Sequence, residues 1–172
     1  MLRIIGGGLV IAATSGAGFT YGMWLQEYLE ILLYLRHVIY LLKGELKYTN
    51  APLNEVFGRA SHRVKEPYRG WFQVMAHQVE TREGKGFFKI WIQSVDRCLG
   101  DLHLKKEHVM LLKELGACLG QMDSESESRN FQLYLERMEL EIEKERTGLA
   151  AKRRIGNCLG VMSGIFLVII LL

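Results

Sequence analysis

Proline and cysteine are scarce in this chain of 172 residues, which has two prolines and three cysteines. The cysteines, Cys98, Cys118 and Cys158, form no Cys-x-x-Cys pair, so we expect neither a disulfide framework nor a cysteine-bound metal. Both prolines, Pro52 and Pro67, stand where a helix can begin, and elsewhere apolar residues recur three and four positions apart. The predicted fold class is therefore all-α.

Charged side chains are missing from both ends of the chain. The charge-free run 155–172 is long enough, at roughly 27 Å, to just cross the hydrocarbon core of a bilayer as a helix. Lys152, Arg153 and Arg154 precede it directly, and basic residues collect on the cytoplasmic side of a span. A second charge-free run, 4–24, follows Arg3. We therefore expect two transmembrane helices, with both termini outside and the intervening residues in the cytoplasm.

The first charge-free run also has features of a cleaved signal peptide, because a short basic start and small residues such as Ala12 and Ala17 are typical of one. Against cleavage, apolar character continues to Trp24. Small residues recur every four positions in both runs, a spacing that lets membrane helices pack closely, although glycine is also simply common there. These rows are Gly8, Ala12 and Gly16 in the first run, and Gly156, Gly160 and Gly164 in the second.

The predicted organisation is thus a membrane helix at 1–24, a cytoplasmic domain at 25–154 and a membrane helix at 155–172. The middle segment is long enough for one domain with a core, expected as an antiparallel bundle of about six helices. Ser124 and Glu127 have the form of a capping box for the sixth helix, which lacks proline and is expected to continue into the second span. The helices are expected from the first span to about 47, from about 53 to 60, 67 to 79, 87 to 99, 105 to 119, and from about 124 onward.

Catalytic and ligand-binding signatures are missing from the sequence. His103 and His108 are five residues apart and so lie on different helix faces, and the other three histidines, His37, His62 and His77, have no cysteine or acidic partner at metal-ligand spacing. No nucleophile elbow or phosphate-binding loop occurs. Basic and acidic residues are interspersed, which does not favour nucleic acid as a partner. We therefore expect a protein that is no enzyme and has no cofactor.

Gly116 and Gly120 lie four residues apart, on one face of the expected fifth helix, and Asp123 follows. Glycines at this spacing permit the close approach of a neighbouring helix, at a cost of about 1 kcal/mol each relative to alanine. A neighbouring helix should therefore pack on this face. A tight helical hairpin with no functional role would be enough to explain the motif.

With these glycines and the terminal glycine row, the chain resembles the stage III sporulation protein AB family of endospore-forming bacteria over its whole length. The resemblance includes Glu45, Tyr48 and Pro52 in the pattern Glu-x-x-Tyr-x-x-x-Pro-Leu, and Trp91 in the fourth helix. Two positions depart from the family pattern: Glu127 replaces a glutamine, and Gly156 replaces an aromatic residue.

The resemblance implies a non-enzymatic protein of the mother-cell membrane around the forespore, in the channel complex required for endospore formation. Its helical domain is similar to the cytoplasmic domains of platform proteins in type II secretion and type IV pilus assembly. The implied partners are a secretion-type ATPase, stage III sporulation protein AA, and other stage III membrane proteins, with homo-oligomers also open. Candidate docking charges are Arg59, Arg63, Arg69, Arg82 and Lys85.

Three other interpretations stay open at this stage. The chain could be a helical membrane adaptor in a vegetative secretion or pilus-like system, a static anchor that only recruits the ATPase, or a membrane enzyme whose catalytic residues are not recognisable.

Overall fold

A computed structural model describes residues 2–48, 51–81, 86–119 and 124–171, and within these the side chains of many residues in 2–19, 124–128 and 150–171 lie outside the described set. The described residues form α-helices and a single 3-10 turn, with no strand, so the all-α prediction is confirmed. The chain divides into two compact units. One comprises Met1–Leu33 with Glu141–Leu172, and the other is Tyr34–Leu140.

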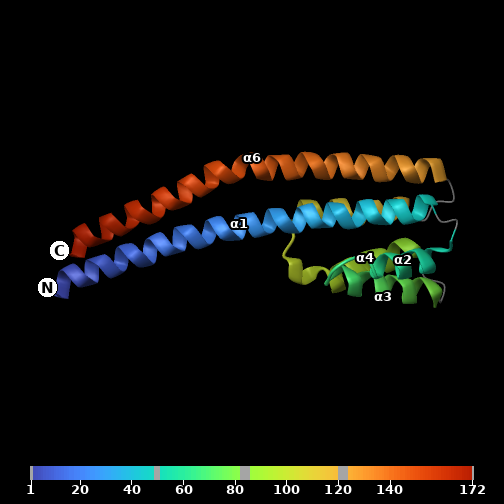
Figure 1. Cartoon of the computed structure of the whole chain (residues 1–172), viewed down its shortest axis with the longest axis horizontal. Helices are drawn as coiled ribbons and strands as arrows, with labels where there is room; N and C mark the ends of the chain where they lie inside the picture. The colour runs from blue at the N-terminus through green and yellow to red at the C-terminus, as the bar shows by residue number, and fades with distance from the viewer. Residues whose placement is uncertain (1, 49–50, 82–85, 120–123, 172) are drawn as a thin grey trace. The chain divides into compact units, whose positions relative to one another are not determined.

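The two longest helices are α1, Leu2–Tyr48, and α6, Ser124–Leu171 (Figure 1). Both are continuous, as the absence of proline predicts, and both contribute residues to each unit. In the second unit α1 buries Leu35, Ile39 and Leu42, a spacing of three and four that places them on one helix face.

Three shorter helices lie in the second unit: α2, Leu53–Ser61, α3, Tyr68–Glu80, and α4, Phe87–Cys98 (Figure 1). Pro52 and Pro67 are the residues that directly precede α2 and α3, where the missing proline N–H has no intrahelical partner to lose. The helices pack in chain order, α2 on α3, α3 on α4 and α4 on α5.

Aromatic side chains fill the space between these helices. Trp71 and Trp91 are fully buried and meet edge to face, with ring centroids 4.9 Å apart. Phe57 of α2 packs against Phe72 of α3 at 5.7 Å and against Trp91 of α4 at 6.3 Å. Such pairs add specificity to the apolar burial.

A short connection that the sequence pattern does not predict joins α4 to α5. It contains a 3-10 turn, Gly100–Leu102, and then His103 in the left-handed conformation with φ of 49°. The fifth helix, α5, is Lys106–Cys118. The predicted helix ends at 99 and 105 are therefore each within one residue of the observed ones, and the turn between them is the new feature.

In the described part of the chain, no helix combines the length and the apolar character that crossing a membrane requires. The two expected spans are therefore not confirmed by the structure. The expected capping box also remains a prediction, because the side chains of Ser124 and Glu127 lie outside the described set.

Candidate functional site

The contact between α4 and α5 contains the first predicted motif residue. Gly116 is buried beneath the indole ring of Trp91, and a Cβ at position 116 would overlap that ring. Trp91 Nε1 donates a hydrogen bond of 2.9 Å to the carbonyl oxygen of Leu112, one helical turn before Gly116. The indole thus lies across the α5 backbone, and only glycine leaves room for it.

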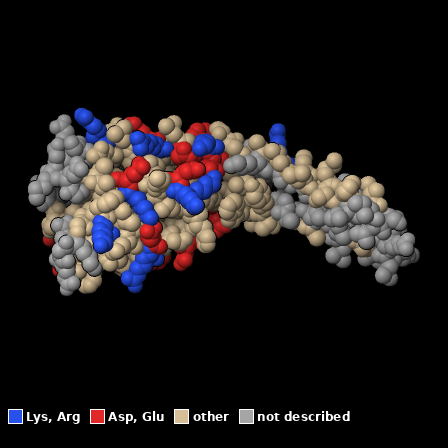
Figure 2. Space-filling view, turned by 180° about the vertical axis from the view of Figure 1, so that it is seen from behind, with Lys and Arg blue, Asp and Glu red and all other residues tan. Residues whose placement is uncertain are grey.

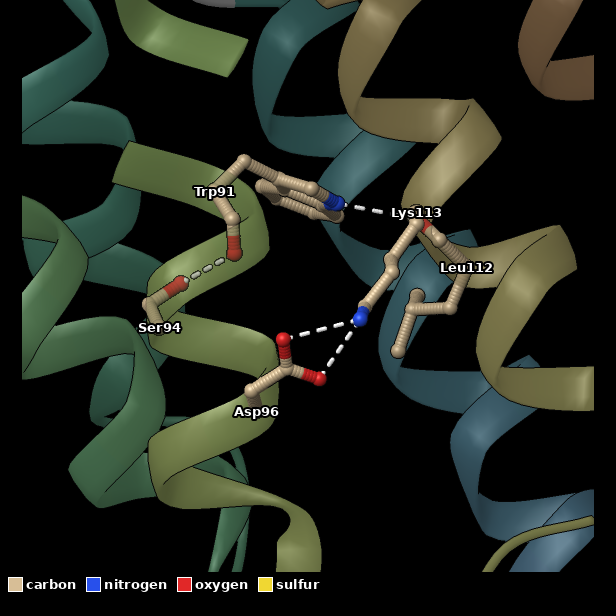
Figure 3. A network of polar contacts seen from close by, with 5 residues as sticks. All are labelled: Trp91, Ser94, Asp96, Leu112 and Lys113. Carbon is tan, nitrogen blue, oxygen red and sulfur yellow. Dashed lines mark hydrogen bonds and ion pairs between the residues drawn. The ribbon is translucent and has the colours of Figure 1, made fainter. Parts of the chain in front are cut away.

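Figure 3 shows how the polar groups of this contact are placed on α4 and α5. Lys113 Nζ of α5 lies 2.6 Å and 2.8 Å from the two carboxylate oxygens of Asp96 of α4. This ion pair is partly exposed, so its contribution to stability is about 0–1 kcal/mol. It joins α5 to α4 beside the tryptophan.

Ser94 connects the same tryptophan to α3. Its buried hydroxyl accepts a hydrogen bond of 2.9 Å from Trp71 Nε1, and its own hydrogen can reach the Trp91 carbonyl at 2.8 Å or Met75 Sδ at 3.0 Å. The sequence analysis missed this residue. Its signal was a serine three positions after Trp91, on the apolar face of an amphipathic helix, where a hydroxyl needs a buried partner.

The other two residues of the glycine motif, Gly120 and Asp123, lie outside the described residues. The expectation of a second close contact at position 120 therefore stays a prediction, as does a capping role for Asp123.

The motif Glu45, Tyr48 and Pro52 lies where α1 ends and α2 begins. Glu45, whose side chain is only 15% exposed, forms an ion pair of 2.5 Å with Arg63, which follows α2. Tyr48 is 86% exposed, and Pro52 directly precedes α2. Glu45 thus ties the α1 end to the α2 end, whereas the Tyr48 ring is available to a partner.

Three of the five candidate docking charges have partners within the chain. Arg59 pairs with Glu55 at 3.2 Å, Arg63 pairs with Glu45, and Arg69 Nε donates to the carbonyl of Val64 at 3.3 Å. Arg82 and Lys85 lie outside the described residues. On the face shown in Figure 2, basic and acidic side chains are intermingled, without a separate patch of either sign.

Within the described residues, no group of three or more histidine, cysteine or acidic side chains is placed to hold a metal ion. Cys98, Cys118 and Cys158 are free thiols, and burial raises the pKa of the Cys98 thiol, which makes it a poor nucleophile. That the protein is no enzyme and uses no cofactor stays a prediction.

A groove of about 440 Å³, part of it open to solvent, lies between α5 and α6. Its apolar lining includes Leu111 and Leu115 of α5 and Leu133 of α6. Glu114 and Arg137 stand on its two sides and form a loose ion pair of 3.5 Å.

The sequence profile of the stage III sporulation protein AB family matches residues 3–172 of the chain. The chain belongs to this family. Its similarity to stage III sporulation protein AB of Bacillus subtilis (strain 168) is 25% identity over 173 residues and covers the whole of both proteins. A solved structure of stage III sporulation protein AB superposes with a TM-score of 0.64 at 22% identity, covering 72% of this chain and 97% of the other. That likeness establishes the shared fold.

Membership in the stage III sporulation protein AB family confirms the resemblance read from Glu45, Tyr48, Pro52, Trp91 and the glycine motif. It also indicates a role in sporulation, with other sporulation proteins as the expected partners. The terminal glycines Gly156, Gly160 and Gly164 and the basic residues Lys152, Arg153 and Arg154 all fall within α6. Of these, only Arg154 has a described side chain, which is exposed.

Proposed function

We propose that the protein is a non-enzymatic membrane platform in the complex that joins mother cell and forespore, and that its helical domain docks a secretion-type ATPase. The observation that carries the proposal is the continuity of α1 and α6. Each helix has one part in the helical unit Tyr34–Leu140 and another in a charge-free terminal stretch of the chain. Such helices would link the helical domain, on which the cytoplasmic ATPase docks, continuously to the membrane.

The membrane part of the proposal rests on the sequence. The runs 4–24 and 155–172 lack charge, and Lys152, Arg153 and Arg154 favour a cytoplasmic position for everything before the second run. A reporter enzyme that is active only outside the cytoplasm, fused after Leu172, tests this topology. We expect activity. An inactive but intact fusion would contradict the two-span arrangement.

The docking part of the proposal rests on family membership and on the character of the domain surface. Charges of both signs are intermingled, and the exposed aromatic Tyr48 stands at one end of α1, in a residue class that is enriched at the centres of interfaces. In this proposal ATP hydrolysis belongs to the partner, the secretion-type ATPase.

Site-specific photo-crosslinking in sporulating cells tests docking. A photoreactive residue is placed at exposed positions of the helical domain, Tyr48, Lys89 and Lys106, and for comparison at Met162 and Phe166 of terminal α6. We expect the ATPase to be captured from at least one domain position and from neither terminal position. Capture of membrane proteins alone would leave a membrane scaffold and contradict ATPase docking.

A further inference from the structure

The groove between α5 and α6 is not used by the packing or the motifs described above. Leu111, Leu115 and Leu133 line it, yet Leu133 is 48% exposed. An apolar hollow with an apolar side chain projecting beside it is the arrangement in which helices interlock as knobs into holes. The α5–α6 face therefore has both a projecting side chain, Leu133, and a groove that could receive such a side chain.

The charges around the groove indicate which surface would fit. Glu114 stands on the α5 side and Arg137 on the α6 side. In a two-fold symmetric interface, residue i of one copy meets residue j of the other, and j meets i. A surface with one acid and one base on opposite sides is complementary to itself in this way.

We propose that this α5–α6 face binds a second copy of the chain. In the pair, Glu114 of each copy faces Arg137 of the other, and Leu133 of each copy enters the groove of the other. The intramolecular pair that Glu114 and Arg137 now form is weak, since both side chains are at least 60% exposed and 3.5 Å apart, so exchanging it between copies costs little. Burial of the leucine side chains supplies the driving force.

Complementary charge reversal distinguishes a second copy from any other occupant. Glu114→Arg gives a copy with two basic side chains at the groove, and Arg137→Glu gives one with two acidic side chains. Each variant repels itself, but the two variants match each other at both contacts. A different partner protein at this face would not produce this pattern.

The experiment uses the full chain, coexpressed in two copies with different affinity tags and purified in detergent. We expect capture of the second tag for the parent, a several-fold loss for each variant with itself, and recovery when Glu114→Arg is paired with Arg137→Glu. Circular dichroism checks that each variant is folded, as expected for exposed positions. The matched control is Arg36→Glu, which breaks a different ion pair of α6, Arg36 to Glu139 at 2.9 Å, and should leave capture at the parent level.

Leu133→Gln provides a test that changes no charge and should also lower capture several-fold. The proposal is overturned if the parent shows no self-capture, if each charge variant captures itself as well as the parent does, or if the mixed pair fails to recover.

Discussion

The indole ring of Trp91 rests on Gly116, so close that a single added carbon at position 116 would overlap it. The ring is held there by its hydrogen bond to the Leu112 carbonyl, 2.9 Å away, and by its edge-to-face contact with Trp71. A glycine in a helix costs stability, and here that cost is offset by the burial of a complete tryptophan between α4 and α5.

Replacing Gly116 with alanine should therefore destabilise the helical domain, although alanine is the better helix former. Overpacking of this kind costs about 1–3 kcal/mol, measured as a lower midpoint of thermal or denaturant unfolding. The matched control is Gly58→Ala in α2, where a Cβ meets no atom within 4 Å. That change should raise stability by up to about 1 kcal/mol. Equal effects of the two substitutions would show that the indole does not set the requirement for glycine.

The helices themselves could be predicted from the sequence because apolar spacing and proline position are local signals. Pro52 and Pro67 predict the starts of α2 and α3, and the uninterrupted pattern after Asn130 predicts a long α6. The turn containing His103 could not be predicted, because its left-handed backbone depends on the packing of both neighbouring helices and not on a glycine in the sequence.

The glycine motif indicated a close contact but not its partner. That the neighbour of Gly116 is Trp91 follows from how α4 crosses α5, and single-sequence spacing contains no information about such a pairing. The same holds for Ser94 and Trp71, which are 23 residues apart in sequence and whose side chains meet between α3 and α4. Tertiary pairs of this kind are set by the crossing of helices, which the periodic pattern does not fix.

Ser94→Ala should destabilise the domain because it leaves the buried Nε1–H of Trp71 without its acceptor. The expected loss is about 1–3 kcal/mol, the cost of an unsatisfied buried donor. In a double-mutant cycle with Trp71→Phe, which removes that donor, Ser94→Ala should cost clearly less. If the two substitutions are simply additive in denaturant unfolding, the hydrogen bond does not account for the effect.

Two buried tyrosines should make the domain sensitive to alkaline pH. Tyr68 and Tyr134 are almost fully buried, and neither hydroxyl has a hydrogen-bond partner among the described residues. Burial raises the pKa of both hydroxyls. The pKa of Tyr68 is raised further by Tyr34, and the pKa of Tyr134 is raised further by Tyr68. The folded state therefore holds both protons more tightly than the unfolded chain, in which a tyrosine titrates near pH 10.

This stabilising effect is complete below about pH 10 and is lost as the pH rises further, by about 1.4 kcal/mol per pH unit for each tyrosine. Denaturant unfolding between pH 8 and 11 measures it. The variant Tyr68→Phe/Tyr134→Phe should lose less stability over this range. At neutral pH it should be no less stable than the parent, since it removes hydroxyls that make no hydrogen bond. An identical alkaline loss in parent and variant would contradict the assignment.

Leucine at both Gly160 and Gly164 should weaken assembly of the protein with other sporulation membrane proteins and leave the helical domain folded. The reason is that small residues four apart allow membrane helices to approach closely, and two leucines prevent that approach. Copurification of partner proteins from detergent-solubilised membranes of sporulating cells measures assembly, and circular dichroism measures folding.

The matched control replaces Met162 and Phe166 with leucine. Both side chains are exposed and lie off the glycine row, so their replacement should leave copurification unchanged. Unaltered copurification of the glycine variant would show that this row does not form the contact, and an equal loss in the control would show that the effect is not specific to the glycine row.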